Sequence, residues 1–366
     1  MSNPWENVAL SDYENHMSLD SVCQLPALNE IMKEQFGICA AKSVMILGIA
    51  GGNGLEHIDP AVVETVYGVD VNADYLDVCN RRYPQLQGVL KTLQIDLLKE
   101  STKLPQAELL IANLLVEYIG YECFKQVVEQ VSPKAVSCVI QINTGESFVS
   151  ASPYVHSFDC LEAVPHQMEE EALVQTMQKI GYAKKTVTER VLPNGKKFVR
   201  VDFEKFIYRL ATLHDLKAIW NKNIADNPED ERWARWKEEY IGYNKSGMAQ
   251  TFVVVCGDEP VGECTLLRDP ACSAIRGCLE LANGKEVANI NALRIAKEFE
   301  GQGHVSMLMA CVEEYAKEQE IQTLTIGVEA AETRNLAIYL HWGYDAFVMS
   351  ETEDGVLVLY YKKALI

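Results

Sequence analysis

The sequence predicts two consecutive domains, a doubly wound and mostly parallel α/β sheet followed by a mixed α+β fold. The chain has 366 residues, which is more than one hydrophobic core usually organises. The first half alternates short apolar runs with helical stretches, a pattern typical of parallel sheets covered by helices. The second half lacks this regular alternation. We therefore predict a first domain over residues 1–204 and a second over residues 205–366.

The first domain is built from five apolar runs of strand length, with helical or polar stretches between them. We expect strands at Ser43–Leu47, Thr65–Val69, Gly88–Gln94, Ala107–Asn113 and Ala135–Asn143. A helix near His166–Ile180 leads into Lys184–Leu192, and a Pro-Asn-Gly turn returns the chain as Lys197–Phe203. This terminal hairpin argues against an all-parallel dinucleotide-binding sheet.

The first 40 residues form a polar segment with aromatic anchors, including Trp5 and Tyr13. Apolar residues at helical spacing predict a helix over Leu25–Phe36. The segment could cover a pocket as a lid, or it could simply pack against the sheet. The residues alone leave both interpretations open.

The second domain begins with a strand at Phe206–Ala211 and tryptophan-containing helices around residues 220–236. Further strands are expected at Gln250–Cys256, Val261–Leu267, Ile290–Ile295, Thr323–Val328, Ala346–Ser350 and Val356–Tyr361. Helices are expected at Val305–Gln319, before the fourth of these strands, and at Arg334–Trp342, before the fifth. Their order is that of a mixed α+β domain.

The charge of the chain restricts its partners. Net charge is −19, and acidic residues outnumber basic ones in both halves. Nucleic acid and anionic membranes are therefore poor partners, because both require clusters of lysine and arginine. A cationic acceptor such as an amine would be attracted, although the preferred interpretation is acidity that only keeps the protein soluble.

Eleven scattered cysteines show neither a C-x-x-C pair nor a zinc-like spacing with histidine. An odd number cannot pair fully within one chain, and we find no signal peptide and no long apolar run. We therefore expect reduced thiols, a cytoplasmic location and no metal site. A homo-oligomer is left open.

Small residues follow the first buried strand, where residues 44–54 read Val-Met-Ile-Leu-Gly-Ile-Ala-Gly-Gly-Asn-Gly. Only a backbone without bulky side chains lets a nucleoside approach closely. Asp70 ends the second strand, Asp96 follows the third and Asn113 ends the fourth. Because open α/β sheets bind ligands at the carboxyl ends of their strands, we predict a cofactor site here. The alternative is a tight turn that serves packing only.

These residues resemble the class I S-adenosylmethionine-dependent methyltransferase family over residues 1–203. The resemblance implies a Rossmann-like fold, with Asp70 as the ribose-binding acid and Asp96 as the adenine-contacting acid. The cofactor-binding residues that it implies are Gly48, Ala50, Gly52, Asn53, Asp70, Val71, Asp96, Leu97 and Asn113. Ile46 stands where an acid is common, and Ala50 replaces the middle glycine of the family motif. The sequence Asn-Leu-Leu-Val-Glu after the fourth strand disfavours methylation of nucleic acid or glutamine.

Methyl transfer needs a general base only when the acceptor carries a proton. Candidate residues are Tyr13, His16, Glu117 and Tyr118, of which we select Glu117 and Tyr118 because they lie just beyond the fourth strand. For each of them a purely structural role is the competing interpretation.

A second glycine-rich turn lies in the second half, between the strand that ends near Ile295 and the helix that begins near Val305. Residues 299–306 read Phe-Glu-Gly-Gln-Gly-His-Val-Ser. Backbone N–H groups in such a turn can hold a pyrophosphate without a lysine. A helix that ends at Trp342-Gly343-Tyr344 follows later.

This pair of motifs resembles the GNAT acetyltransferase family over residues 205–366. Glu300 through Val305 is similar to the family's cofactor loop, with Glu300 in place of the basic or amide residue and Val305 in place of the last small one. The resemblance implies an acetyl-coenzyme A site formed by Leu293, Ile295, Gly301, Gly303, His304, Val305, Ser306 and Asn335. It also implies that Tyr339 protonates the departing thiolate, a role that suits a phenol. Glu263 is a candidate for the acceptor base, with a surface position on its strand as the competing and preferred interpretation.

Together these observations predict a bifunctional transferase that methylates and acetylates small-molecule acceptors, such as amines. One alternative is that one or both domains are non-catalytic binding or scaffolding modules. Another is a nicotinamide-dependent dehydrogenase in the first half, which would share the glycine turn and Asp70.

Overall fold

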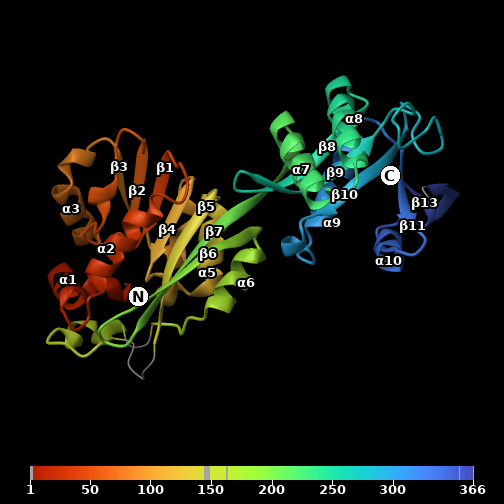
Figure 1. Ribbon diagram of the computed structural model, residues 1–366. Coiled ribbons are helices and arrows are strands. Elements are labelled where there is room, and N and C mark those ends of the chain that lie inside the picture. Colours follow the sequence, from red (N-terminus) through yellow and green to blue (C-terminus); the bar gives the residue numbers. More distant parts are fainter. Residues whose placement is uncertain (1–2, 144–148, 162–163, 354, 366) are drawn as a thin grey trace. The chain divides into compact units, whose positions relative to one another are not determined.

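The computed structural model describes residues 3–143, 149–161, 164–353 and 355–365 (Figure 1). The chain divides into two compact units, residues 1–205 and residues 206–366, which we call unit 1 and unit 2. Strand β7 (Lys197–Leu210) contributes to both. Sequence analysis predicted two strands here, Lys197–Phe203 and Phe206–Ala211, and this prediction is wrong. Glu204 and Lys205 stay extended, because no glycine, proline or asparagine interrupts the run.

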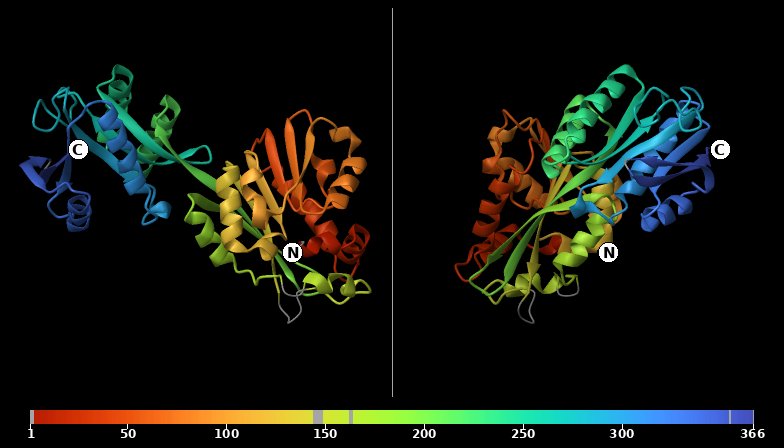
Figure 2. Two further views of the ribbon diagram at one scale, coloured as in Figure 1. Left: turned by 180° about the vertical axis from the view of Figure 1, so that it is seen from behind. Right: turned by 45° about the vertical axis from the view of Figure 1, so that its right-hand side comes forward.

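Unit 1 is a single sheet with helices on both faces (Figures 1 and 2). Its strands are β1 (Ser43–Leu47), β2 (Thr65–Asp70), β3 (Leu90–Gln94), β4 (Leu109–Asn113), β5 (Ala135–Ile142), β6 (Tyr182–Val191) and β7 up to Lys205. The helices are α1 (Leu10–Ser18), α2 (Gln24–Gln35), α3 (Ala73–Arg82), α4 (Leu97–Glu100), α5 (Val116–Val131) and α6 (Glu170–Gln178). A short 3-10 helix, Pro4–Asn7, precedes them.

The strand order of unit 1 is β3-β2-β1-β4-β5-β7-β6. The first five strands of this order are parallel, whereas β7 runs antiparallel to both β5 and β6. The carboxyl ends of β1, β2 and β4 therefore meet at one edge of the sheet. The predicted doubly wound fold with a terminal hairpin is confirmed.

Strand β1 shows why the sheet holds helices on both faces. Met45 and Leu47 belong to a core that includes side chains of α5 and α6. Val44 and Ile46 belong to a second core with side chains of α2 and α3. Because successive residues of a strand point to opposite faces, an uninterrupted apolar run is buried on both sides.

Unit 2 is a mixed sheet with strand order β7-β8-β9-β10-β11-β13-β12. Its further strands are β8 (Ala249–Cys256), β9 (Glu259–Leu267), β10 (Val287–Ile295), β11 (Thr323–Glu329), β12 (Ala346–Glu353) and β13 (Val356–Ala364). Its helices are α7 (Leu213–Asp226), α8 (Arg232–Ser246), α9 (His304–Glu318) and α10 (Thr333–His341). All neighbouring strands are antiparallel except β10 and β11. The predicted α+β class is confirmed.

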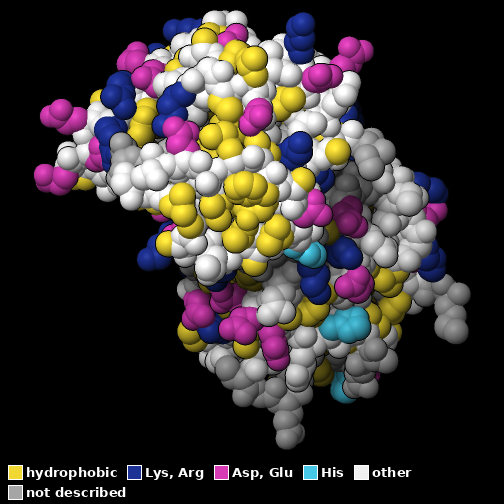
Figure 3. All heavy atoms as spheres, turned by 90° about the vertical axis from the view of Figure 1, so that its right-hand side faces the viewer, with side chains coloured by type: hydrophobic (Ala, Val, Ile, Leu, Met, Phe, Trp, Pro, Cys, Tyr) yellow, Lys and Arg dark blue, Asp and Glu magenta, His cyan; other side chains and the backbone are white. Residues whose placement is uncertain are grey.

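Helices cover both faces of the unit 2 sheet as well. Side chains of α7 and α8 share a core with Ala249 of β8, and Phe252 of the same strand contacts Tyr315 of α9, with 5.4 Å between their ring centroids. Hydrophobic side chains are also exposed at the β12–β13 end of the sheet (Figure 3), where Phe347 is 57% and Leu357 46% accessible.

Two further findings concern predicted absences. No helix in the described part of the chain is long and apolar enough to cross a membrane. The described residues also hold no cluster of three or more histidine, cysteine, aspartate or glutamate side chains that could bind a metal ion.

Candidate functional sites

The glycine turn of unit 1 is held in place by Asp70. The Asp70 carboxylate accepts the backbone N–H of Ala50 at 2.9 Å and that of Asn72 at 3.0 Å. Ala50 adopts a left-handed conformation with φ of 48°, so alanine occupies this position at a cost of about 1–2 kcal/mol relative to glycine. Burial raises the pKa of Asp70, and the two backbone N–H groups oppose this rise.

Most of the predicted cofactor residues of unit 1 line one cavity of about 120 Å³, which we call the cofactor cavity. The predicted residues in its wall are Gly48, Ala50, Asp70, Val71, Asp96, Leu97, Asn113 and Tyr118. Asn53 lines a neighbouring hollow of about 40 Å³. Gly52 lies in neither wall, because it packs inside the turn, where a Cβ atom would come within 2.7 Å of Tyr83.

Two predicted polar side chains already have partners inside the protein. The amide of Asn113 forms two reciprocal hydrogen bonds with Gln35 of α2, both at 2.8 Å. Asp96 caps α4 through the N–H of Leu98 and forms an ion pair with Lys99 at 2.6 Å. Both residues therefore stabilise the edge of the cavity, whatever else they bind.

The N-terminal segment, which sequence analysis left as either a lid or a packing segment, contributes walls to the cofactor cavity. Trp5 and Asn3 line the cofactor cavity. Their segment is fixed by hydrogen bonds from Asn72 to the carbonyl of Trp5 at 3.1 Å and from Tyr75 to the carbonyl of Val8 at 2.8 Å. The aromatic anchors in an otherwise polar segment were the only sequence signal for this role.

Glu117 and Tyr118 line a second hollow of about 70 Å³, which we call the inner cavity. It shares Trp5, Tyr13, Leu114 and Tyr118 with the cofactor cavity, so the two cavities adjoin at these side chains. Glu117 is completely buried, and burial raises its pKa to about 7. His16 lines the inner cavity too, with its Nδ1 atom 2.7 Å from the hydroxyl of Ser152.

In unit 2 the strands β10 and β11 separate partway along their length. They pair only from Val287 to Ile290, although β10 continues to Ile295. A bulge interrupts the pairing of β10 with β9 between Asn291 and Arg294, and Ala292 has φ of 47°. The separation opens a cavity of about 1,280 Å³ beside the end of β10.

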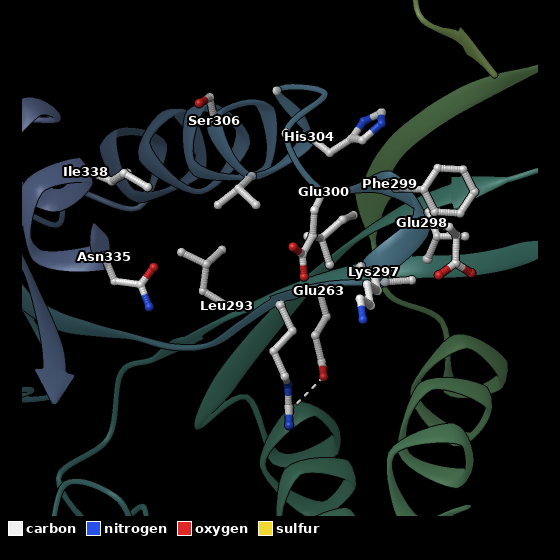
Figure 4. A pocket seen from close by; sticks show the side chains of 18 of the residues that line it. Glu263, Leu293, Lys297, Glu298, Phe299, Glu300, His304, Ser306, Asn335 and Ile338 are labelled. Atoms are coloured by element: carbon white, nitrogen blue, oxygen red, sulfur yellow. Dashed lines mark ion pairs between the residues drawn. The ribbon is translucent and has the colours of Figure 1, made fainter. Parts of the chain in front are cut away.

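Every predicted cofactor residue of unit 2 lines this cavity, and so does Tyr339. The amino terminus of α9 faces it without a capping side chain. Gly303 before this helix has φ of 87°, a conformation that favours glycine. Figure 4 shows Leu293, Asn335 and Glu300 around one space, whereas the ring of His304 turns away. The centroid of that ring lies 4.0 Å from the ring centroid of Phe206, and its Nδ1 atom lies 2.7 Å from the hydroxyl of Tyr208. A ligand in the cavity would therefore meet the backbone of His304 and not its ring.

A buried ion pair forms another part of the cavity wall. Glu263 of β9 is 1% exposed and pairs with Arg294 of β10 at 2.8 Å. The guanidinium of Arg294 lies over the rings of both Trp220 and Trp233, 4.8 and 5.0 Å from their centroids. Among the described residues, the second carboxylate oxygen of Glu263 has no hydrogen-bond partner. Sequence analysis missed Arg294.

We expect Arg294→Met to lower the free energy of unfolding by about 3 kcal/mol at pH 8, because the buried Glu263 would lose its counter-charge. The loss should be smaller at pH 5. Burial already raises the pKa of Glu263, and removing Arg294 would raise it further. An acid with a raised pKa in the folded state keeps its proton there to higher pH. The stability lost on removing Arg294 therefore grows as the pH rises above the folded-state pKa of Glu263 in the unmodified chain.

Urea denaturation at both pH values measures this effect, with Arg235→Met of the exposed face of α8 as the matched control. A loss that is equal at pH 5 and pH 8, or no larger than that of the control, would contradict the expectation.

Comparison with known families matches residues 211–344 to the acetyltransferase (GNAT) family. These residues form a GNAT domain. The resemblance inferred from the cofactor loop and the later tyrosine motif is thereby confirmed. The GNAT domain is similar to the crystal structure of a putative GNAT-family acetyltransferase from Desulfovibrio desulfuricans, with 11% identity and a TM-score of 0.36, covering 44% of this chain and 99% of that one.

Solved structures similar to the first half include methyltransferases. A putative S-adenosylmethionine-dependent methyltransferase from Listeria monocytogenes has 16% identity and a TM-score of 0.37, covering 49% of this chain and 99% of its own. Geranyl diphosphate methyltransferase in complex with SAM has 12% identity and a TM-score of 0.39, covering 49% of this chain and 84% of its own. No curated protein sequence matches the chain.

Proposed function

We propose that the protein is a bifunctional transferase in which the GNAT domain acetylates an amine with acetyl-coenzyme A and unit 1 methylates a small-molecule acceptor with S-adenosylmethionine. The observation that carries the proposal is the separation of β10 and β11 beside the uncapped amino terminus of α9. Parted strands expose backbone N–H and C=O groups to an extended amide chain, and a free helix amino terminus suits a diphosphate.

The residues around this cavity fit acetyl-coenzyme A. Its volume of about 1,280 Å³ exceeds the roughly 300–1,000 Å³ typical of pockets for smaller ligands. The same wall carries cationic groups from Lys222, Lys297 and Arg334. It also carries acidic side chains, which are Asp226, Glu263, Glu298 and Glu300. The cofactor would supply an activated acetyl thioester. Burial raises the pKa of Tyr339 to about 12, so its phenol stays protonated at neutral pH and can donate a proton.

On the acceptor side of the GNAT domain, the unpartnered oxygen of Glu263 is the group that an amine N–H would satisfy. Arg294 keeps this carboxylate in place, and the two tryptophan rings fix Arg294 in turn. We assign Glu263 to amine binding and proton acceptance.

The polar groups of unit 1 suit S-adenosylmethionine, since Asp70 and the glycine turn meet at the carboxyl ends of β1 and β2. The cofactor would supply an electrophilic methyl group on a sulfonium. At about 120 Å³ the cofactor cavity is smaller than a ligand of this size requires. Tyr13 lines this cavity, the inner cavity and the small hollow at the glycine turn. Binding would therefore displace Tyr13 or the segment that carries Trp5.

Calorimetric titration of the full chain with acetyl-coenzyme A and with S-adenosylmethionine, separately and together, tests the proposal. We expect saturable binding of each with a Kd in the micromolar range, followed by turnover on a panel of primary amines. A domain that fails to bind its cofactor is a scaffold instead. Titration with NADH, monitored by its fluorescence, tests the dehydrogenase alternative. Saturable NADH binding would support hydride transfer, in place of methyl transfer, as the function of unit 1.

A further inference from the structure

The inner cavity of unit 1 contains a carboxylate that is only half satisfied. Glu117 lies in the first turn of α5 and is completely buried. One of its oxygens accepts the backbone N–H of Gln141 at 2.6 Å. The other, Oε2, has no hydrogen-bond partner among the described residues. Leaving a buried charged group without a partner costs several kcal/mol, so a ligand that donates a hydrogen bond here would gain that energy.

Aromatic side chains line part of the remaining wall. Trp5 and Tyr118 meet edge to face with 4.9 Å between their ring centroids, and Phe158 lies 4.9 Å from the ring of His16. Aromatic faces attract cations, most strongly where water is excluded. A buried carboxylate among aromatic rings is therefore a suitable environment for an ammonium group.

Four other titratable side chains face the inner cavity, namely His16, Lys196, Tyr13 and Tyr118. His16 is held by Ser152, and burial together with the charge of Lys196 lowers its pKa, so it is neutral at pH 7. Burial also lowers the pKa of Lys196 to about 8. Tyr13 and Tyr118 stay protonated because burial raises their pKa values. Glu117 is thus the only one of these five residues that can carry a negative charge near neutral pH.

We propose that the inner cavity binds the nitrogen of the methyl acceptor, and that this acceptor is a primary or secondary aliphatic amine whose ammonium group donates an N–H to Oε2 of Glu117. The proposal rests on the function proposed for unit 1. The N–H bond breaks, the proton forms an O–H bond on Glu117, and the electron pair stays on nitrogen as the lone pair that a methyl acceptor needs. The cavity of about 70 Å³ admits the amino group and a few carbon atoms.

An alcohol would also offer a hydrogen-bond donor, but its proton is far harder to remove. Aliphatic ammonium groups have a pKa near 10.4, as in lysine, whereas a hydroxyl resembles water with a pKa of about 15.7. Glu117 has a pKa of about 7. The pKa of an aliphatic ammonium is closer to this value than the pKa of a hydroxyl by roughly five pKa units, so the amine is the better matched substrate.

Fluorine NMR of the full chain labelled with 5-fluorotryptophan tests the proposal, because Trp5 lines the inner cavity and the other tryptophans belong to unit 2. The Trp5 resonance is assigned from Trp5→Phe. Propylamine hydrochloride is titrated against propan-1-ol at equal concentration and constant ionic strength. We expect the Trp5 resonance to shift saturably with propylamine, and at least tenfold less with propan-1-ol.

Glu117→Gln should weaken the apparent affinity for propylamine at least tenfold, whereas Glu122→Gln on the exposed face of the same helix should not. No shift, an equal shift with the alcohol, or an unchanged affinity in Glu117→Gln would overturn the proposal. If Glu117→Gln fails to fold, the comparison of amine and alcohol in the unmodified chain decides alone.

Calorimetry with S-adenosylmethionine on the same preparation separates the two claims. An amine response without cofactor binding would overturn methyl transfer and leave the amine site in place. Cofactor binding without an amine response would overturn the amine site only.

Discussion

Tyr339→Phe should lower the kcat of acetyl transfer by about 10²–10⁴-fold, the usual contribution of a general acid. Its phenol lines the cavity of the GNAT domain and lies 6.0 Å from the ring of Trp342, measured between centroids. Phenylalanine keeps this packing and removes only the proton donor. Release of free thiol from acetyl-coenzyme A, with the best acceptor from the amine panel, measures the rate.

The affinity for acetyl-coenzyme A should stay within about twofold in Tyr339→Phe, because the proton is needed by the leaving thiolate and not by the bound thioester. Tyr361→Phe on β13 is the matched control, since Tyr361 packs against Phe347 and lies outside the cavity. A loss below tenfold, or an equal loss in Tyr361→Phe, would show that Tyr339 has a structural role. The pKa of about 12 also predicts no alkaline loss of activity from this group below about pH 11.

Asp70→Ala should weaken binding of S-adenosylmethionine by at least 100-fold in calorimetric titrations. The carboxylate holds the N–H groups of Ala50 and Asn72, and the turn that would contact the cofactor depends on both. Hydrogen bonds to a charged group contribute about 1.5–3 kcal/mol each, so the free energy of unfolding of unit 1 should also fall by about 3 kcal/mol.

Asp77→Ala, on the exposed face of α3, is the control for Asp70→Ala and should change neither quantity. Binding of acetyl-coenzyme A to Asp70→Ala should equal that of the unmodified chain. If Asp70→Ala bound S-adenosylmethionine normally while losing stability, Asp70 would serve the turn alone.

Local patterns were sufficient to predict most elements. The first predicted strand coincides with β1, and the expected helix over Leu25–Phe36 differs from α2 by one residue at each end. Such agreement arises because strands and helices impose different spacings on apolar residues. The separate strands predicted within Lys197–Ala211 were wrong, because a strand that exchanges pairing partners shows no break in its own alternation.

In the candidate sites too, local patterns identified some residues, whereas others are recognised only in the folded structure. Glycine turns and the acids at strand ends are local features, and the sequence located Gly48, Asp70, Gly303 and Tyr339, all of which line cavities. Trp5 and Arg294 gave no comparable signal. Each acquires its place from a partner distant in sequence, Tyr118 for the first and Trp220 for the second.

The sequence by itself determined the order of strands and helices, the two glycine turns and the residues that stand beside them, since these depend on neighbours a few positions apart. Only the tertiary structure decided which polar side chains keep an unsatisfied group. Asn113 and Asp96 have partners in the described structure, whereas Glu117 and Glu263 each retain a buried oxygen without one. Hydrogen bonding and desolvation depend on groups brought together from across the chain, so no local pattern records them.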